Sequence, residues 1–344
     1  MRRVGWAMGL LLLAGCALRP PESETETVWR WPPPPDPARV AFVAQLAALP
    51  DLVPRDRLSQ WRRRLSRAPL PTEPLFVKPY DVAAAAGQVV VSDTAGGRVL
   101  LLDLPGRAVR VIDGGARPLR HPLGVALDGR GRIYVVDGAR ALVRLFDPWG
   151  HDLLLLGAGH LRRPRDVAVS ADGERIYVLD VAGPGDDAHH LVVLDRTGGE
   201  IARWGGRGRA PGRFNMPNQV AVAANGEVVV LDAGNFRVQV FTADGRPLRQ
   251  FGSLGRGLGQ FARPRGLAVD GTGRIYVTDA AFQNYQIFDA MGRLLLPVGQ
   301  GGGSGPGRFA LPAGIAVDER GFIYVADQLF RHLSVFRLLE AEQD

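Results

Sequence analysis

Cysteine, lysine and long apolar stretches are scarce in this chain of 344 residues, and each shortage excludes a class of protein. The single cysteine, Cys16, rules out an intramolecular disulfide. Lysine occurs once, at Lys78, and the other 41 of the 42 basic residues are arginines scattered along the chain. Scattered basic residues predict no nucleic-acid partner, although the formal net charge is +7. The apolar run at residues 4–13 is too short to span a bilayer.

Glycine and proline, in contrast, are abundant, with 44 and 26 residues respectively. Hydrophobic residues still make up 46% of the chain, which is enough to bury a sizeable core. Many turns combined with such a core indicate short strands and argue against a helical bundle.

The N-terminus predicts export from the cytoplasm. Arg2 and Arg3 precede the apolar run, as in a signal peptide, here residues 1–15. The next residues, Leu-Ala-Gly-Cys at 13–16, resemble the bacterial lipobox, which implies cleavage before Cys16 and acylation of its thiol. The same resemblance, with Ala17 after the cysteine, implies a lipid anchor in the cell envelope, in the outer membrane and facing the periplasm. An ordinary signal peptide with an incidental cysteine is the alternative.

A proline-rich tether is predicted at residues 16–36. It contains a polar stretch and four consecutive prolines at 32–35, a composition that favours an extended polyproline II spacer. Such a spacer would hold the rest of the chain away from a membrane surface. Trp29 and Trp31, within it, are predicted to dock on the domain.

Six similar units fill the rest of the chain. Each unit opens with a proline and a short apolar run, and the prolines are Pro79, Pro122, Pro164, Pro217, Pro264 and Pro312. A turn, often Asp-Gly or Asn-Gly, leads to a second apolar run, which is a hairpin signal. Each second run ends in an aspartate, and these are Asp93, Asp137, Asp180, Asp232, Asp279 and Asp327. We expect the aspartates to accept backbone N–H groups of the loop that follows each of them.

Four antiparallel strands per unit predict an all-β fold, a six-bladed β-propeller at residues 76–344. The last unit lacks a fourth strand, and an open blade would expose an unpaired edge. Residues 39–46 are predicted to supply that strand, with a helix capped by Asp36-Pro37 as the alternative. Residues 57–67, with arginines at 62–64 on a solvated face, are predicted to form a short helix. The closing strand and this helix together make up residues 37–75.

The fourth unit has the most characteristic sequence. It reads FNMPNQVAV at 214–222 and VLDAGNFRVQVF at 230–241, and residues 261–279 and 309–327 read similarly. These segments resemble the NHL-repeat family. The first three units keep the proline, the turn and the aspartate. The resemblance covers about residues 76–337; it implies the propeller fold and carries little information about activity.

The residues just after the opening prolines are candidates for a binding site. In a propeller, the innermost strands all begin on one face, at a mouth of the central channel. The polar residues at these positions are Tyr80, Asp81, Arg165, Asp166, Asn218, Gln219 and Arg265. Arg165 and Arg265 are predicted to bind an anion, and Asn218 and Gln219 to orient it. The alternative is that these groups hydrogen-bond only to channel water and neighbouring backbone.

The third unit carries an insertion after Asp180 that is predicted to project onto the same mouth. It contains Asp186, Asp187, His189 and His190, which are residue types that ligate metals. Their spacing matches no metal motif, so a recognition loop is the favoured interpretation.

Resemblance to other propellers leaves two functions open. Peptidyl-hydroxyglycine lyases hold zinc through histidines beside the opening prolines, and gluconolactonase-like proteins hold a divalent ion through Glu, Asn and Asp. No histidine directly follows an opening proline here. Asp81, Asp166 and Asn218 match only part of the second set.

We therefore expect a non-catalytic binding, scaffold or sensor module, similar to the propeller sensor domains of bacterial receptor kinases. It would need no cofactor and would bind an envelope protein, a peptide or a glycan at the channel mouth. A metal-dependent lyase or lactonase using Zn or Ca is the alternative. The oligomeric state stays open.

Overall fold

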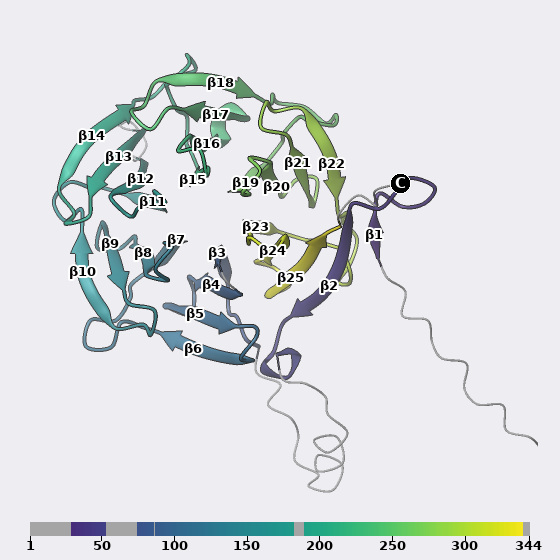
Figure 1. Cartoon of the computed structure of the whole chain (residues 1–344), viewed down its shortest axis with the longest axis horizontal. Helices are drawn as coiled ribbons and strands as arrows, with labels where there is room; N and C mark the ends of the chain where they lie inside the picture. The colour runs from purple at the N-terminus through teal and green to yellow at the C-terminus, as the bar shows by residue number, and fades with distance from the viewer. Residues whose placement is uncertain (1–28, 53–73, 86, 182–188, 340–344) are drawn as a thin grey trace, which may run out of the picture.

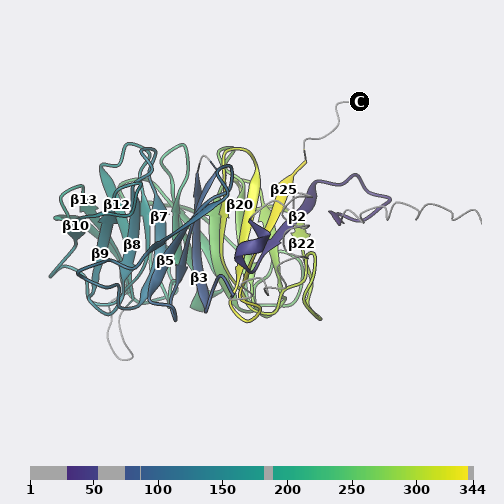
Figure 2. The ribbon, with the colours of Figure 1, turned by 90° about the horizontal axis from the view of Figure 1, so that it is seen from below.

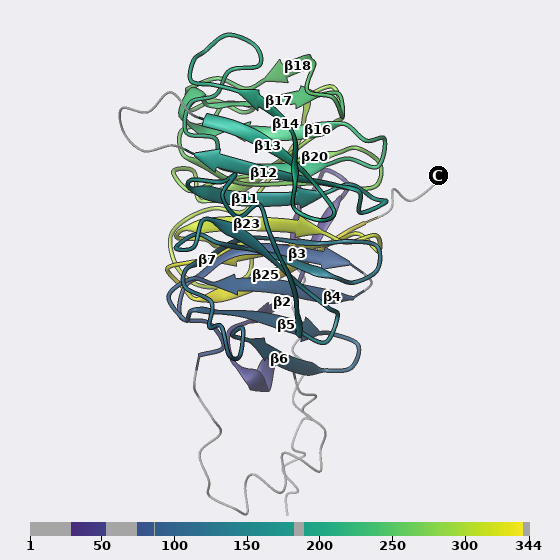
Figure 3. The same cartoon turned by 90° about the vertical axis from the view of Figure 1, so that its left-hand side faces the viewer.

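Six antiparallel sheets stand around a central axis (Figure 1). The computed structural model describes residues 29–52, 74–85, 87–181 and 189–339. Seen from the side, the sheets form one thick ring (Figures 2 and 3). The innermost strand of each sheet packs against the innermost strands of its two neighbours. The predicted six-bladed β-propeller is confirmed.

Each blade runs outward from the axis in four strands. Blade 1 contains β3 (Pro79–Ala85), β4 (Gln88–Asp93), β5 (Arg98–Asp103) and β6 (Ala108–Ile112), and blade 2 contains β7 (Pro122–Leu127), β8 (Ile133–Asp137), β9 (Leu142–Phe146) and β10 (Asp152–Leu156). Blade 3 contains β11 (Pro164–Val169), β12 (Arg175–Val181), β13 (His189–Asp195) and β14 (Glu200–Gly205), and blade 4 contains β15 (Gln219–Val222), β16 (Val228–Asp232), β17 (Arg237–Phe241) and β18 (Pro247–Phe251). Blade 5 contains β19 (Pro264–Val269), β20 (Ile275–Asp279), β21 (Asn284–Phe288) and β22 (Leu294–Val298), and blade 6 contains β23 (Pro312–Val317), β24 (Phe322–Asp327), β25 (His332–Leu338) and β2 (Val40–Leu46). Two short 3₁₀ turns, η1 (Leu49–Asp51) and η2 (Ala233–Asn235), complete the described elements.

The second strand of a blade is apolar on both faces because it is covered on both sides by neighbouring blades. In β8, β16 and β20 every residue is buried. Such continuous apolar runs are typical of strands that pack on two faces. Strands on the outer edge, such as β18, are largely exposed or half-buried. The core therefore lies in wedges between blades, not at the axis.

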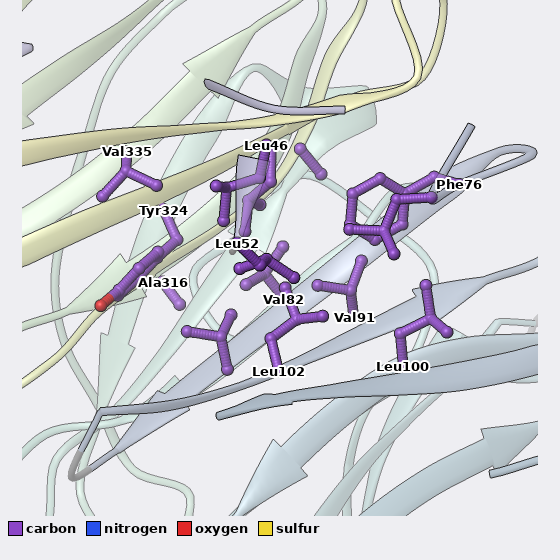
Figure 4. Close-up of a cluster of buried hydrophobic side chains, with 14 residues drawn as sticks. Leu46, Leu52, Phe76, Val82, Val91, Leu100, Leu102, Ala316, Tyr324 and Val335 are labelled. Atoms are coloured by element: carbon purple, nitrogen blue, oxygen red, sulfur yellow. The ribbon is translucent and has the colours of Figure 1, made fainter. Parts of the chain in front are cut away.

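The N-terminal strand closes the ring, as predicted. β2 pairs antiparallel with β25, joining residues separated by almost the whole length of the chain. Val40 of β2 packs into the core between blades 5 and 6, and Leu46 at its other end packs between blades 6 and 1, beside Phe76 and Tyr324 (Figure 4). One strand therefore supplies core side chains to both seams of blade 6.

A fifth strand comes from the predicted tether. β1 (Arg30–Trp31) pairs with β2 on its outer side. The Trp31 ring lies edge-on to Phe336, with 5.7 Å between ring centres. The docking predicted for Trp31 is therefore present, and the spacer cannot extend through residues 30 and 31.

The aspartates that end the second strands are buried, and they hold each blade to the segment that leads into it. Lys78 N–H donates to Asp93 at 2.7 Å, Asn215 N–H to Asp232 at 2.7 Å, and Ala310 N–H to Asp327 at 2.7 Å. Asp137, Asp180 and Asp279 make the equivalent bonds. The prediction placed these bonds in the loop after each aspartate. Among the described residues, that loop donates backbone N–H groups only to Asp279 and Asp327, because the carboxylate points back across the hairpin to the preceding segment.

Several predictions concern residues outside the described ranges. They include the signal peptide, Cys16, the helix at 57–67 and the loop residues Asp186 and Asp187. Within the described ranges, no helix is long and apolar enough to cross a membrane.

The closure by β2 can be tested with one isosteric substitution at two positions of that strand. Val40 is fully buried, whereas Val43 is 48% exposed beside a bulge in the β2–β25 pairing. Val40→Thr should destabilise the fold by about 1–3 kcal/mol, because it buries a hydroxyl without a partner. Val43→Thr, the matched control, should change stability by less than about 0.5 kcal/mol. Urea unfolding followed by tryptophan fluorescence measures both; equal midpoints for the two variants would contradict the role assigned to β2.

Candidate functional site

The first residue after each opening proline lies at the face where the innermost strands begin, and we call this face the mouth. Around the ring these residues alternate between long and short side chains. Tyr80, Arg165 and Arg265 belong to blades 1, 3 and 5, and Leu123, Asn218 and Ala313 lie between them. The alternation gives the three long side chains room to converge near the axis.

A pocket of about 620 Å³ opens at the mouth. Its basic side chains are Lys78, Arg163, Arg165, Arg207 and Arg265. Two histidines, His121 and His189, also line it. Among the described residues, the lining holds no aspartate or glutamate. The mouth therefore combines several cations with no described counter-charge.

Two arginines of the pocket have weak neutral partners among the described residues. Arg165 Nε donates to the Tyr80 hydroxyl at 3.3 Å. Arg265 donates to Gln328 Oε1 at 3.4 Å. The other polar atom of Gln328, Nε2, is buried and has no hydrogen-bond partner in the described part of the chain. Burial lowers the pKa of Arg265, and the neighbouring charge of Arg165 lowers it further. We call Tyr80, Arg165, Arg265 and Gln328 the inner quartet.

Asp81, Asp166 and Gln219 form a second layer below the mouth, which we call the neck. Each is the second residue after its proline, and all three are buried. Asp81 accepts Val125 N–H at 2.9 Å, Asp166 accepts Val220 N–H at 2.8 Å, and Gln219 accepts Leu267 N–H. Each side chain therefore caps the backbone of the next blade. Gln219 Nε2 also donates to Asp81 across the channel.

Glycine occupies the same position in the other three blades because the next blade leaves no space there for a side chain. A Cβ on Gly314 would lie 2.5 Å from Asp81 Cα. A Cβ on Gly124 would likewise collide with the Asp166 carboxylate. The neck is therefore closed by three polar side chains and three bare backbones.

Burial raises the pKa of Asp81 to about 6 and holds the pKa of Asp166 well above its usual range, where the charge of Asp81 adds to the effect. The two carboxyl groups lie close enough to shift each other's pKa. Asp166 Oδ1 has no hydrogen-bond partner among the described residues. A proton shared between the two carboxyls would satisfy this oxygen.

The structure separates the predicted site residues. Tyr80, Arg165, Arg265 and His189 line the mouth pocket, and Asp81, Asp166 and Gln219 lie in the neck. Asn218, predicted to orient a ligand, donates its side-chain amide to the Arg265 carbonyl instead. His189 and His190 are not loop residues, because they begin β13 and pair with the end of β12.

The mouth also contains Gln328, Lys78, Arg163 and Arg207, which were not among the predicted site residues. Gln328 directly follows the buried Asp327, and Lys78 and Arg163 directly precede opening prolines. The sequence did mark these three residues, because each lies next to the recurring proline or aspartate of its unit. Arg207 lies in an inter-blade connection and had no such marker.

The structure brings together part of the metal-ligand set considered for an enzyme, Asp81 and Asp166. Within the described residues, no group of three or more His, Cys, Asp or Glu side chains lies close enough to hold a metal ion. Asp81 and Asp166 meet in the neck, but the Asn218 amide is committed to the Arg265 carbonyl. These contacts suit a structural pair better than a ligand triad.

The shared proton predicts a specific pH dependence of stability. The folded-state pKa values lie above those of the unfolded chain, so their stabilising contribution is complete below about pH 4 and is lost as the pH rises through the folded-state values. For Asp81 the loss is on the order of 3 kcal/mol. Asp166→Asn keeps the acceptor for Val220 and offers Asp81 an amide N–H, so its melting temperature should fall less between about pH 5 and about pH 8.

Asp244→Asn, on an exposed turn, is the matched control and should follow the parent protein. Differential scanning calorimetry across this pH range measures all three proteins. A parent melting temperature that rises with pH through this window, or an Asp166→Asn profile parallel to it, would contradict the shared proton.

Comparison with known proteins agrees with the repeat assignment. The family model for the NHL repeat matches residues 214–241 and 261–288, in blades 4 and 5. Human E3 ubiquitin-protein ligase TRIM32 is 47% identical over 45 residues, covering 13% of this chain and 7% of the relative. Human NHL repeat-containing protein 3 is 35% identical over 81 residues, covering 24% of this chain and 22% of the relative. The matches span less than a quarter of either relative, so they carry over the repeat and not a whole-protein activity.

Solved structures resemble the whole ring at low sequence identity. A protein of unknown function from Bacteroides thetaiotaomicron superposes with a TM-score of 0.60 at 18% identity, covering 78% of this chain and 71% of that chain. A gluconolactonase from Xanthomonas campestris gives 0.58 at 21% identity, covering 77% and 87%. A streptogramin B lyase gives 0.56 at 11% identity, covering 77% and 94%. Similarity at these identities concerns the fold alone. The chain is a six-bladed β-propeller that carries NHL repeats.

Proposed function

We propose that this propeller is a non-catalytic recognition module that binds an envelope protein, a peptide or a glycan at its mouth. The observation that carries the proposal is the row of basic side chains around the pocket without a described counter-charge. Structural arginines elsewhere in the fold have carboxylate partners, such as Arg237 with Asp232 and Arg249 with Glu227. Lys78, Arg163 and Arg207 are exposed and have no such partner among the described residues.

The positive rim favours a partner with a negatively charged contact surface. Charges of one sign around an opening steer oppositely charged partners and raise the rate of association. The connections between blades that reach this face, including the glycine-rich one at 205–212, also offer backbone groups to a partner.

A metal-dependent lyase or lactonase is the competing function, and its support is the fold shared with the gluconolactonase and lyase structures. It would have to use Asp81, Asp166 and Asn218, whose side chains each already bond to the backbone of another blade. Metal analysis of the purified full chain separates the two functions. Stoichiometric Zn or Ca that is lost in Asp166→Asn would favour the enzyme.

Charge reversal on the rim tests recognition at the mouth. The double variant Lys78→Glu, Arg207→Glu should reduce capture of the partner at least about tenfold, because each lost charged contact costs on the order of 1 kcal/mol or more. Arg246→Glu is the matched control, since Arg246 is exposed on a β17–β18 turn at the opposite face. The assay is in-cell crosslinking of the full chain followed by quantitative mass spectrometry. A partner set that is equally depleted in both variants, or in neither, would contradict recognition at the mouth.

We also propose that acylation of Cys16 holds the protein in the outer membrane, facing the periplasm. The lipobox-like residues 13–16 support this anchor, and residues 16–29 are long enough to serve as a short spacer before β1. Cys16→Ala should move the protein from the membrane fraction to the supernatant of a Gram-negative host and abolish labelling by an alkyne fatty acid. Ser23→Ala is the control and should keep both properties. Labelling that survives Cys16→Ala would overturn the assignment.

A further inference from the structure

We propose that the inner quartet is an oxyanion site, which binds a carboxylate or phosphate group of the ligand at the centre of the mouth. This inference rests on the proposed function, because it names the chemistry that the mouth recognises. The side chains of the quartet differ from Lys78 and Arg207, which are changed in the test of the rim.

The inner quartet consists of side chains from four different blades. Arg165 and Arg265 come from blades 3 and 5, Tyr80 from blade 1 and Gln328 from blade 6. The residues between the long side chains are Leu123, Asn218 and Ala313, and the Asn218 amide points away, to a backbone carbonyl. Donor groups from four blades therefore line the same pocket at the mouth.

The hydrogen-bond donors of the inner quartet outnumber its acceptors. A guanidinium has five N–H groups and no acceptor. Among the described residues, the side chain of Arg165 makes one hydrogen bond, to Tyr80, and the side chain of Arg265 makes one long hydrogen bond, to Gln328. Gln328 Nε2 is buried with no acceptor in that part of the chain. The quartet thus has an excess of donors that suits an acceptor-rich group.

The two arginines of the quartet carry like charges close to each other. Burial lowers the pKa of Arg265, and the nearby charge of Arg165 lowers it further. Like charges held together without a counter-ion destabilise a fold, and an anion between them removes the repulsion. Two planar guanidinium forks suit the paired oxygens of a carboxylate or phosphate, which is why arginine is favoured at such sites.

Titration of the full chain with inorganic phosphate and with acetate, at low ionic strength, tests the site by isothermal calorimetry. We expect saturable binding of one or both anions. The anion that binds more tightly indicates whether the ligand group is a phosphate or a carboxylate. Arg165→Gln and Arg265→Gln should each weaken that binding at least tenfold, and Arg265→Lys, which keeps the charge but loses the fork, should fall between. Arg246→Gln, at the opposite face, is the matched control and should bind like the parent.

A fourth variant separates ligand binding from a structural role. Gln328→Glu is isosteric and places a carboxylate beside Arg265, so it should raise the melting temperature and abolish phosphate or acetate binding together. A merely structural Gln328 would not link the two effects. Absence of binding by both anions, or binding unchanged in Arg165→Gln and Arg265→Gln, would overturn the inference.

The two proposals fail separately. If the anions bind at the quartet but the rim charge reversal leaves partner capture intact, the oxyanion site stands and recognition at the mouth does not. If partner capture depends on the rim but no anion binds, recognition stands and the oxyanion site does not.

Discussion

Closure of the ring by β2 is the constraint on which the rest of the structure depends. A propeller blade is stable only when both of its faces are covered, so six blades must meet without a gap. β2 lies beside β25 and contributes Val40 to the seam with blade 5 and Leu46 to the seam with blade 1. The same closure sets the distance of every innermost strand from the axis. The spacing of the mouth and neck residues is therefore a consequence of the pairing between β2 and β25.

Two polar layers with opposite chemistry lie along the channel. In the neck, Asp81 and Asp166 accept backbone N–H groups of neighbouring blades, and burial raises the pKa of both. In the mouth, the partners of Arg165 and Arg265 among the described residues are neutral. Adjacent positions of the same strands thus serve different purposes, because successive side chains of a strand point in opposite directions. The neck stabilises the ring, and the mouth keeps uncompensated charge available for a ligand.

The similar structures share the ring with this chain, and at such low identity the similarity concerns the fold alone. The gluconolactonase and the streptogramin B lyase are propellers of comparable shape, at 21% and 11% identity. A common ring positions six loops around an axis and leaves the chemistry to whichever side chains those loops carry. Here the described lining of the mouth holds five basic side chains, Lys78, Arg163, Arg165, Arg207 and Arg265, and no described acidic one. That composition is suited to binding an anion, which is why we favour recognition over catalysis.

The sequence by itself determined the repeat, the number of blades and the closing strand. Local patterns carry this information: a proline and an apolar run open each unit, a turn follows, and Asp93 and its equivalents end the second strand. The same pattern placed Tyr80, Arg165 and Arg265 on one face. Only the tertiary structure decided that Asp81 and Asp166 meet in the neck, that Asn218 turns to the backbone, and that Gln328 accepts a hydrogen bond from Arg265. These outcomes depend on distances between residues of different blades, and no periodicity within one unit encodes which neighbour a side chain reaches across the axis.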